Sequence, residues 1–408
     1  MPALLSSNIK YNQLVPIVLI MFMFNPMLTL VGLLLYGLSI GNAPTKDRTQ
    51  GFLILFGIVC CVAVSLINMT KVPEGDLWDY VDQYRLAGRL SYYRFLLEAP
   101  EDTVDTIKEP AYYTIVWLMN RLFQGNETLF LFSLSMLEYI LVIYALIYFG
   151  KYYGMRLYVV MTSIIIMCFL PYIFIHSLNI VRQTLANSLL LFIIIRRFFY
   201  EKKDWVLILI MIFIHSSSAL FLPLLLIPTF GKSFKKSWIL YVGTILLLLA
   251  YQLVASYFLG VGDLNQVSAV TNALERAERG NLGDYSIAIL TMIVTVVSLL
   301  YSIYVYAGKV LPSSEGLRKF LSVVIVLSIF ILLISDQTLV ANRFGHYEFT
   351  FFPFLLMVFL QETKIDKSLQ FIVCIATMLF LSYFIYHTVF KFEIDMAGWV
   401  TPVYFYIF

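Results

Sequence analysis

The chain has 408 residues, of which 61% are hydrophobic and only 13% are charged. A soluble chain carries about 25% charged residues, so this composition excludes a soluble globular protein and indicates an all-α polytopic membrane protein. The net charge of +3 is too small to indicate a nucleic-acid partner. The four cysteines lie in apolar runs without a Cys-x-x-Cys or Cys/His spacing, so neither a zinc site nor a disulfide framework is expected.

Long apolar segments follow one another along the chain, many near the roughly 18 residues that a spanning helix needs. The first is too long for the core of a cleavable signal peptide, so a membrane helix is expected there. Asn25-Pro26 is expected to kink it, because proline removes a helix hydrogen bond. The predicted spans are 14–40, 52–70, 128–149, 157–176, 178–199, 237–259, 284–308, 320–335, 344–360 and 368–390.

Two further segments are ambiguous. Residues 111–123 are short enough for a half-helix or an interfacial helix. Residues 204–230 are interrupted by His215-Ser216-Ser217-Ser218 and two prolines. With these segments the prediction is about 10–12 transmembrane helices, some short or re-entrant, in a single transmembrane domain over 1–408. The absence of an internal repeat weakly disfavours inverted-repeat transporter folds.

Lysine and arginine gather in short loops, which marks those loops as cytoplasmic. Residues 196–203 and 232–236 are both strongly basic. For both to lie on the same side, 204–230 must enter and leave the membrane as a re-entrant hairpin; a single crossing there would instead move every later loop to the other side. Under the first interpretation, 71–110 and 260–283 are the two extracytoplasmic loops.

Arg182 is the most informative single residue, because it lies between long hydrophobic segments. A permanent cation inside a membrane helix costs roughly 3 kcal/mol or more. We expect it to line an outward-opening cavity and to bind an anionic ligand together with Gln183. An internal ion pair, or an arginine whose head reaches the membrane surface, is the alternative.

Arg343 is the second cation of this kind. It opens a predicted membrane helix at the outer face, and His346 and Tyr347 share its side of that helix. Planar guanidinium groups bind phosphate oxygens in a bidentate manner, so two arginines from different helices suit a pyrophosphate. An ordinary arginine at the membrane interface is the alternative.

His215 lies about mid-depth in its segment by helix rise, followed by three serines. It is predicted to contact a phosphate or leaving group at the tip of the hairpin, or else to be a neutral imidazole bonded to serine or backbone.

Arg276, in the second outer loop, is predicted to contact substrate as that loop closes. An ordinary ion pair of Glu275 with Arg279 is the simpler interpretation of that stretch.

The first outer loop opens with an expected helix on which Asp76, Asp79 and Tyr80 share a face. A carboxylate there can remove a proton from a sugar hydroxyl; a solvated amphipathic helix on the membrane is the alternative. Trp78, Tyr80 and Tyr84, with Tyr347, are candidates for stacking on sugar rings. The single Asp-x-x-Asp spacing is weak support for magnesium, and no metal or other cofactor is expected.

Glu109, just before Pro110, is a further candidate acid, although such residues are often only helix N-terminal features.

Five of these segments together resemble the EpsG-like branch of Wzy-type polysaccharide polymerases. Their order and spacing match over roughly residues 70–360. The family's histidine segment often has proline after the histidine, where this chain has Ser216. The segments are Asp76-Leu77-Trp78-Asp79-Tyr80, Glu109-Pro110-Ala111-Tyr112-Tyr113, Asn179-Ile180-Val181-Arg182-Gln183-Thr184-Leu185-Ala186, Ile214-His215-Ser216-Ser217-Ser218-Ala219-Leu220, and Arg343 with Tyr347.

The resemblance implies a GT-C-like glycosyltransferase of the bacterial inner membrane with its active site toward the periplasm. Such enzymes join oligosaccharide repeat units carried on undecaprenyl pyrophosphate into O-antigen, capsule or exopolysaccharide. Donor and acceptor are then both lipid-linked, membrane lipid surrounds the protein, and a flippase and a chain-length regulator are possible partners.

A mechanism follows as a hypothesis. Arg182 and Arg343, with His215, bind the donor pyrophosphate and stabilise its charge as it leaves. Asp76 or Asp79 takes the proton of the acceptor sugar hydroxyl, and Glu109 is the next candidate for this role. A flippase for the same lipid-linked sugar is the alternative from another class, and a membrane O-acyltransferase using His215 as base is a third.

Overall fold

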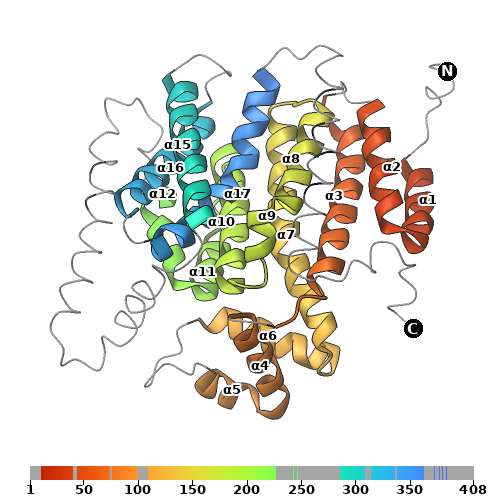
Figure 1. The fold of residues 1–408 in the computed structure, drawn as a ribbon, viewed down its shortest axis with the longest axis vertical. Coiled ribbons are helices and arrows are strands. Elements are labelled where there is room, and N and C mark those ends of the chain that lie inside the picture. The colour runs from red at the N-terminus through yellow and green to blue at the C-terminus, as the bar shows by residue number, and fades with distance from the viewer. Residues whose placement is uncertain are drawn as a thin grey trace. The chain divides into compact units, whose positions relative to one another are not determined.

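The computed structural model describes residues 11–39, 44–73, 76–99, 109–226, 285–307, 314–335 and 338–362, together with single positions at 242, 246, 372, 376, 379 and 383. The regular elements among these residues are helices, joined by turns and short links, and there is one isolated bridge between Pro44 and Arg156 (Figure 1). The predicted spans at 237–259 and 368–390 fall almost wholly outside the described residues, and the outer loop at 260–283 does so entirely.

Four of the described helices are long and apolar enough to cross a membrane. They are Thr49–Asn68 within α3 (Asp47–Asn68), α7 (Glu127–Tyr152), Ile289–Tyr306 within α15 (Tyr285–Ala307) and α16 (Glu315–Leu333). Shorter apolar helices accompany them, which include α1 (Tyr11–Phe24), α2 (Pro26–Ser39) and α8 (Leu157–Phe169). The prediction of an all-α polytopic membrane protein is confirmed.

The chain divides into two compact units. Unit 1 consists of residues 1–84, 119–181 and 359–408. Within it α3 packs against α7 and α8, and Gly57 of α3 lies so close to Ile143 of α7 that a Cβ atom would require Ile143 to move. A buried polar network also joins α3 to α7 and to Ser177 at the end of α9 (Pro171–His176), since the Asn68 amide donates to Ser135 and Ser177 at 2.9 and 2.8 Å.

Unit 2 consists of residues 85–118 and 182–358. Its α15 and α16 pack side by side (Figure 1). It also holds α5 (Tyr92–Glu98), α11 (Trp205–Ile214), the 3₁₀ helix η1 (Ser216–Phe221) and α12 (Leu222–Leu226), together with most of α10 (Val181–Tyr200) and α17 (Thr338–Glu362). The chain passes between the units within α4 (Asp76–Arg89) and within α6 (Pro110–Phe123).

Two breaks in the helices lie just before a proline, and the sequence predicts the first of them but not the second. The first span divides at Asn25, whose side-chain oxygen accepts from the Leu28 N–H at 2.9 Å and so caps α2. The predicted span 157–176 divides at Leu170 into α8 and the short α9 (Pro171–His176), because the Pro171 ring cannot continue the helix hydrogen bonding.

The helix that carries Arg182 begins three residues later than the predicted span 178–199. Residues 177–180 form a turn in which Leu178 has a φ of +64°, and α10 begins only at Val181. Arg182 therefore lies in the first turn of its helix, and its depth cannot be counted along a helix from His176. The reason is local: a positive φ at a non-glycine residue ends one helix before the next begins.

Candidate active site

The carboxylate of Glu109 lies at the centre of a polar cluster in unit 2. Its Oε2 accepts a hydrogen bond from Arg182 Nη1 at 2.6 Å. Its Oε1 lies 2.7 Å from His215 Nδ1 and accepts from the backbone N–H of Ser216 at 3.2 Å. Glu109 is only 4% exposed. An acid, a cation and an imidazole from three distant segments therefore meet at one buried point.

Local chain geometry brings Glu109 and Arg182 to this point. Glu109 directly precedes α6, whose first residue is Pro110. Proline suits the first position of a helix, and an acid there is favoured by the helix dipole. Arg182 lies in the first turn of α10, and its side chain remains 35% exposed. The guanidinium group thus contacts the buried carboxylate while still presenting a surface of its own.

His215 occupies a break between two helices. Its backbone is extended, with φ −152° and ψ 115°, and its N–H closes α11 by donating to Met211. Ser216 begins η1, and the first N–H groups of a helix have no partner within that helix. The Ser216 N–H is consequently available to the Glu109 carboxylate.

The electrostatic balance favours an ionised Glu109. Burial alone raises the pKa of this carboxyl group, but the hydrogen bond from His215 and the charge of Arg182 outweigh burial, and its pKa lies below the ordinary value. An ionised carboxylate only accepts hydrogen bonds, so His215 Nδ1 is the donor. In a neutral imidazole with its proton on Nδ1, Nε2 carries the lone pair, and the His215 side chain is 24% exposed.

Arg343 presents a second cation in unit 2. Its side chain is exposed and makes no hydrogen bond or ion pair with any described residue. Its backbone carbonyl accepts from Gln183 Nε2 at 2.5 Å, and Gln183 is itself buried. The Gln183 amide therefore joins α10 to α17, so that it positions the Arg343 backbone and commits its own donor there.

Further polar pairs join the same two helices. The Thr184 hydroxyl lies 3.3 Å from His346 Nε2, and Asn187 donates to Thr350 at 2.6 Å. His346 and Tyr347 are buried, and the Tyr347 ring packs against Phe221 at a centroid distance of 4.9 Å. Of the three residues predicted to share one side of α17, Arg343 is thus exposed, whereas His346 and Tyr347 lie in the interior.

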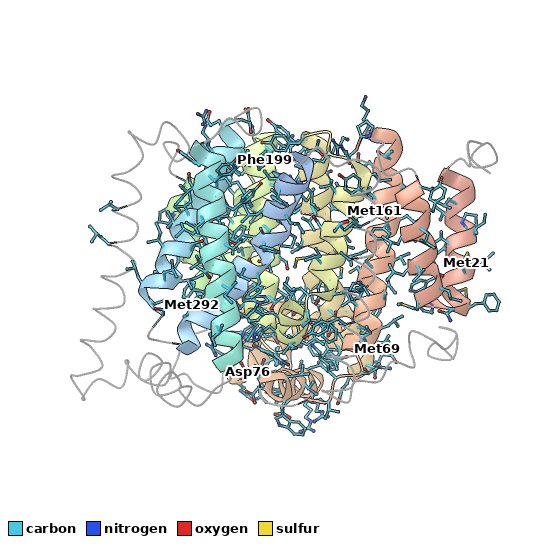
Figure 2. All side chains as sticks on the ribbon, turned by 45° about the horizontal axis from the view of Figure 1, so that its top comes forward. Met21, Met69, Asp76, Met161, Phe199 and Met292 are labelled. Carbon is cyan, nitrogen blue, oxygen red and sulfur yellow. The ribbon has the colours of Figure 1, made fainter. Side chains whose placement is uncertain are left out.

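The helix predicted at the start of the first outer loop is present as α4. Figure 2 labels Asp76 at its first residue. Asp76 and Asp79 are exposed and have no hydrogen-bond or ion-pair partner among the described residues. Trp78 is 52% exposed, whereas Tyr80 and Tyr84 are buried.

Tyr84 is packed within unit 1. Its ring stacks on Phe130 with centroids 4.0 Å apart, and its hydroxyl donates to the Asn126 carbonyl at 3.2 Å. Of the three aromatic residues proposed for sugar stacking in this loop, only Trp78 exposes a large part of its side chain. Arg276 lies outside the described residues, and within the described part of the chain no three His, Cys, Asp or Glu side chains gather as a metal site.

The sequence did not reveal the central position of Glu109. An acid before a proline at a helix start is common, so the motif alone is weak. The Ser216 N–H was also missed, because a backbone donor leaves no signature in the sequence. Both become visible only when the segments around residues 109, 182 and 215 are brought together.

A family model described as the EpsG family matches residues 52–399. The match takes in α3 to α17, and with them Glu109, Arg182, His215 and Arg343. Comparison with curated proteins and with solved structures finds no match. Because the matched residues make up most of the chain, the protein belongs to the EpsG family, whose general role is the polymerisation of polysaccharides.

Proposed function

We propose that this protein joins oligosaccharide repeat units carried on undecaprenyl pyrophosphate, at the outer face of a bacterial inner membrane. The observation that carries the proposal is the cluster of Glu109, His215 and Arg182, which combines a proton acceptor with a cation. Glycosyl transfer from a lipid pyrophosphate requires both, because a hydroxyl must lose a proton while a diphosphate gains charge.

In the proposed reaction His215 Nε2 takes the proton of the acceptor sugar hydroxyl. The Glu109 carboxylate accepts from Nδ1, which orients the ring and stabilises the imidazolium that forms. The acceptor oxygen bonds to the anomeric carbon of the donor as the bond from that carbon to the phosphate oxygen breaks. The phosphate oxygen keeps the bonding electron pair, and the pyrophosphate leaves while still attached to its lipid. Asp76 and Asp79 of α4 are the alternative bases.

The two arginines have different parts in this proposal. Arg182 contacts Glu109 on one side and can contact a ligand on its exposed side. It therefore links the Glu109–His215 pair to the leaving pyrophosphate. Arg343 is exposed, and within the described part of the chain its guanidinium group has no carboxylate partner. It therefore offers a full positive charge to a phosphate, which planar guanidinium groups bind in a bidentate manner.

The sugar-contacting surface is assigned to Trp78, since its side chain is 52% exposed and an indole ring can stack on a sugar ring. Tyr80, Tyr84 and Tyr347 are buried, so in this proposal they support the surrounding helices. A flippase that supplies the substrate and a regulator of chain length are the partners that such a reaction calls for.

Cell-free elongation tests the proposal. Purified protein is incubated with one defined lipid-linked repeat unit, and products are separated by size. We expect longer lipid-linked oligosaccharides and released undecaprenyl pyrophosphate, with His215→Gln inactive. Movement of the unit across a vesicle membrane without elongation would identify a flippase, and transfer of an acyl group to the sugar would identify an acyltransferase; either result overturns the proposal.

A further inference from the structure

A second polar site lies within unit 2 and is formed by residues to which the proposed function gives no role. Helix α15, on which Figure 2 labels Met292, carries four hydroxyl side chains on one face, at spacings of four, three and four residues. All four are buried, at 1% exposure or less, whereas Ile289, Ile293 and Leu300 are more than half exposed. The helix thus turns its polar face inward and its apolar face outward. The four residues are Thr291, Thr295, Ser298 and Ser302.

Glu348 of α17 meets this face. It is 1% exposed, and its Oε1 accepts from the Ser328 hydroxyl of α16 at 2.9 Å. The Ser298 hydroxyl of α15 lies against the same carboxyl group. Glu348 forms no ion pair with any Lys, Arg or His of the described residues. A buried carboxyl group is therefore surrounded by hydroxyls from two neighbouring helices.

Four oxygen atoms of α15 and α17 have no hydrogen-bond partner among the described residues. Hydroxyls in helices usually donate to the carbonyl one turn back, as Ser322 does to Arg318 at 2.7 Å. Thr295, Ser298 and Ser302 of α15 make no such bond, and a buried polar group without a partner is unfavourable. The four atoms are Thr295 Oγ1, Ser298 Oγ, Ser302 Oγ and Glu348 Oε2.

We infer that Glu348, Ser328 and the hydroxyl face of α15 bind a monovalent cation of the sodium type. Carboxylate and hydroxyl oxygens are hard ligands, which small alkali ions prefer. One carboxylate neutralises one positive charge, so the occupied site carries no net charge in a medium where a net charge is costly. A divalent ion would leave an uncompensated charge, and magnesium would also retain several waters.

Thermal unfolding of the purified full chain in detergent tests the inference without any sugar substrate. Sodium chloride is compared with potassium chloride and choline chloride at equal ionic strength. We expect a saturable rise of Tm with sodium, of about 3 °C at a hundredfold excess over Kd, that choline does not produce. Equal Tm values in the three salts would overturn the inference.

Two variants locate the effect. Glu348→Gln keeps the side-chain volume but removes the charge, so the sodium-specific rise should disappear. The matched control is Glu138→Gln, which changes an equally buried glutamate of α7 in unit 1 and should leave the rise intact. If Glu348→Gln does not fold, Ser298→Ala serves instead and should raise the sodium concentration for half-maximal effect about tenfold, as for about 1.4 kcal/mol.

Binding of radioactive sodium to the unmodified protein gives an independent measurement, with one saturable site per chain expected. A sodium response that is unchanged in both Glu348→Gln and Ser298→Ala would place the ion elsewhere and overturn the assignment. Because none of these measurements uses the elongation reaction, failure here leaves the proposed function untouched, and failure of elongation leaves the cation site untouched.

Discussion

Arg182 and Glu109 form an ion pair, which the sequence had left as one of two alternatives for Arg182. An internal ion pair was the alternative to ligand binding at Arg182, and the pair is present at 2.6 Å. The arginine nevertheless remains 35% exposed, and Glu109 also accepts from His215 and Ser216. One carboxylate thus holds a cation and an imidazole in fixed relative positions, which a purely structural ion pair does not require.

Replacement of Glu109 by glutamine tests this arrangement at the level of one residue. Glu109→Gln keeps the size but removes the negative charge that orients His215 and stabilises its protonated form. We expect elongation to fall by roughly 10²-fold or more, while the variant still folds because Arg182 can turn toward solvent. Glu98→Gln, at an exposed glutamate of α5, is the control and should retain activity. Normal elongation by Glu109→Gln would remove the carboxylate from the mechanism.

Stability at acid pH gives a second test of Glu109. Its folded-state pKa lies below the ordinary 4.5, with burial opposed by His215 and Arg182. The unfolded carboxyl group therefore takes up its proton at higher pH than the folded one. The stability contributed by ionised Glu109 is fully present above pH 4.5 and is lost as the pH falls through the lower folded-state pKa.

The corresponding measurement is Tm as a function of pH for the unmodified protein and for Glu109→Gln. The difference between the two should be largest above pH 4.5 and should shrink below it. A difference that stays constant across this range would show that ionisation of Glu109 contributes nothing to folding. Glu98→Gln again supplies the comparison for an exposed carboxyl group.

At the scale of the element, the break between α11 and η1 matters because it frees one backbone donor. Ser216 supplies an N–H to Glu109 at 3.2 Å, at a position where the resembled family often has proline. Ser216→Ala keeps this N–H and should keep full activity. Ser216→Pro removes it while suiting the first position of a helix, so elongation should fall about tenfold, as expected for a lost hydrogen bond to a charged group.

Elongation rates and Tm values of the two Ser216 variants are the measurements that separate backbone from side chain. Equal activity of Ser216→Pro and Ser216→Ala would show that the N–H contributes nothing, and that His215 and Arg182 alone hold the carboxylate. A loss confined to Ser216→Ala would instead assign a role to the hydroxyl group, contrary to the proposal.

At the scale of the whole molecule, the membrane course of 204–230 decides the side on which later loops lie. Helix α11 has ten residues and rises about 15 Å, roughly half of the hydrocarbon thickness. It ends at His215, where the chain turns into η1. This length favours the predicted re-entrant hairpin, in which the basic loops at 196–203 and 232–236 share the cytoplasmic side.

Cysteine labelling in intact cells tests this topology. Lys202→Cys and Lys235→Cys are each treated with a membrane-impermeant thiol reagent, before and after permeabilisation. Both should react only after permeabilisation if the hairpin is re-entrant. Reaction of Lys235→Cys alone in intact cells would show a single crossing. The native cysteines among the described residues are buried, which keeps the background low.

The sequence by itself determined the class of this protein and several of its helices, because hydropathy and helical spacing are local properties. It placed the break at Asn25-Pro26 and the helix from Asp76, and the resemblance it carries agrees with the EpsG match. Only the tertiary structure decided what surrounds Glu109, because its partners lie 73 and 106 residues away. No local pattern encodes such pairings, which arise when helices pack; the same holds for Glu348 and the hydroxyl face of α15.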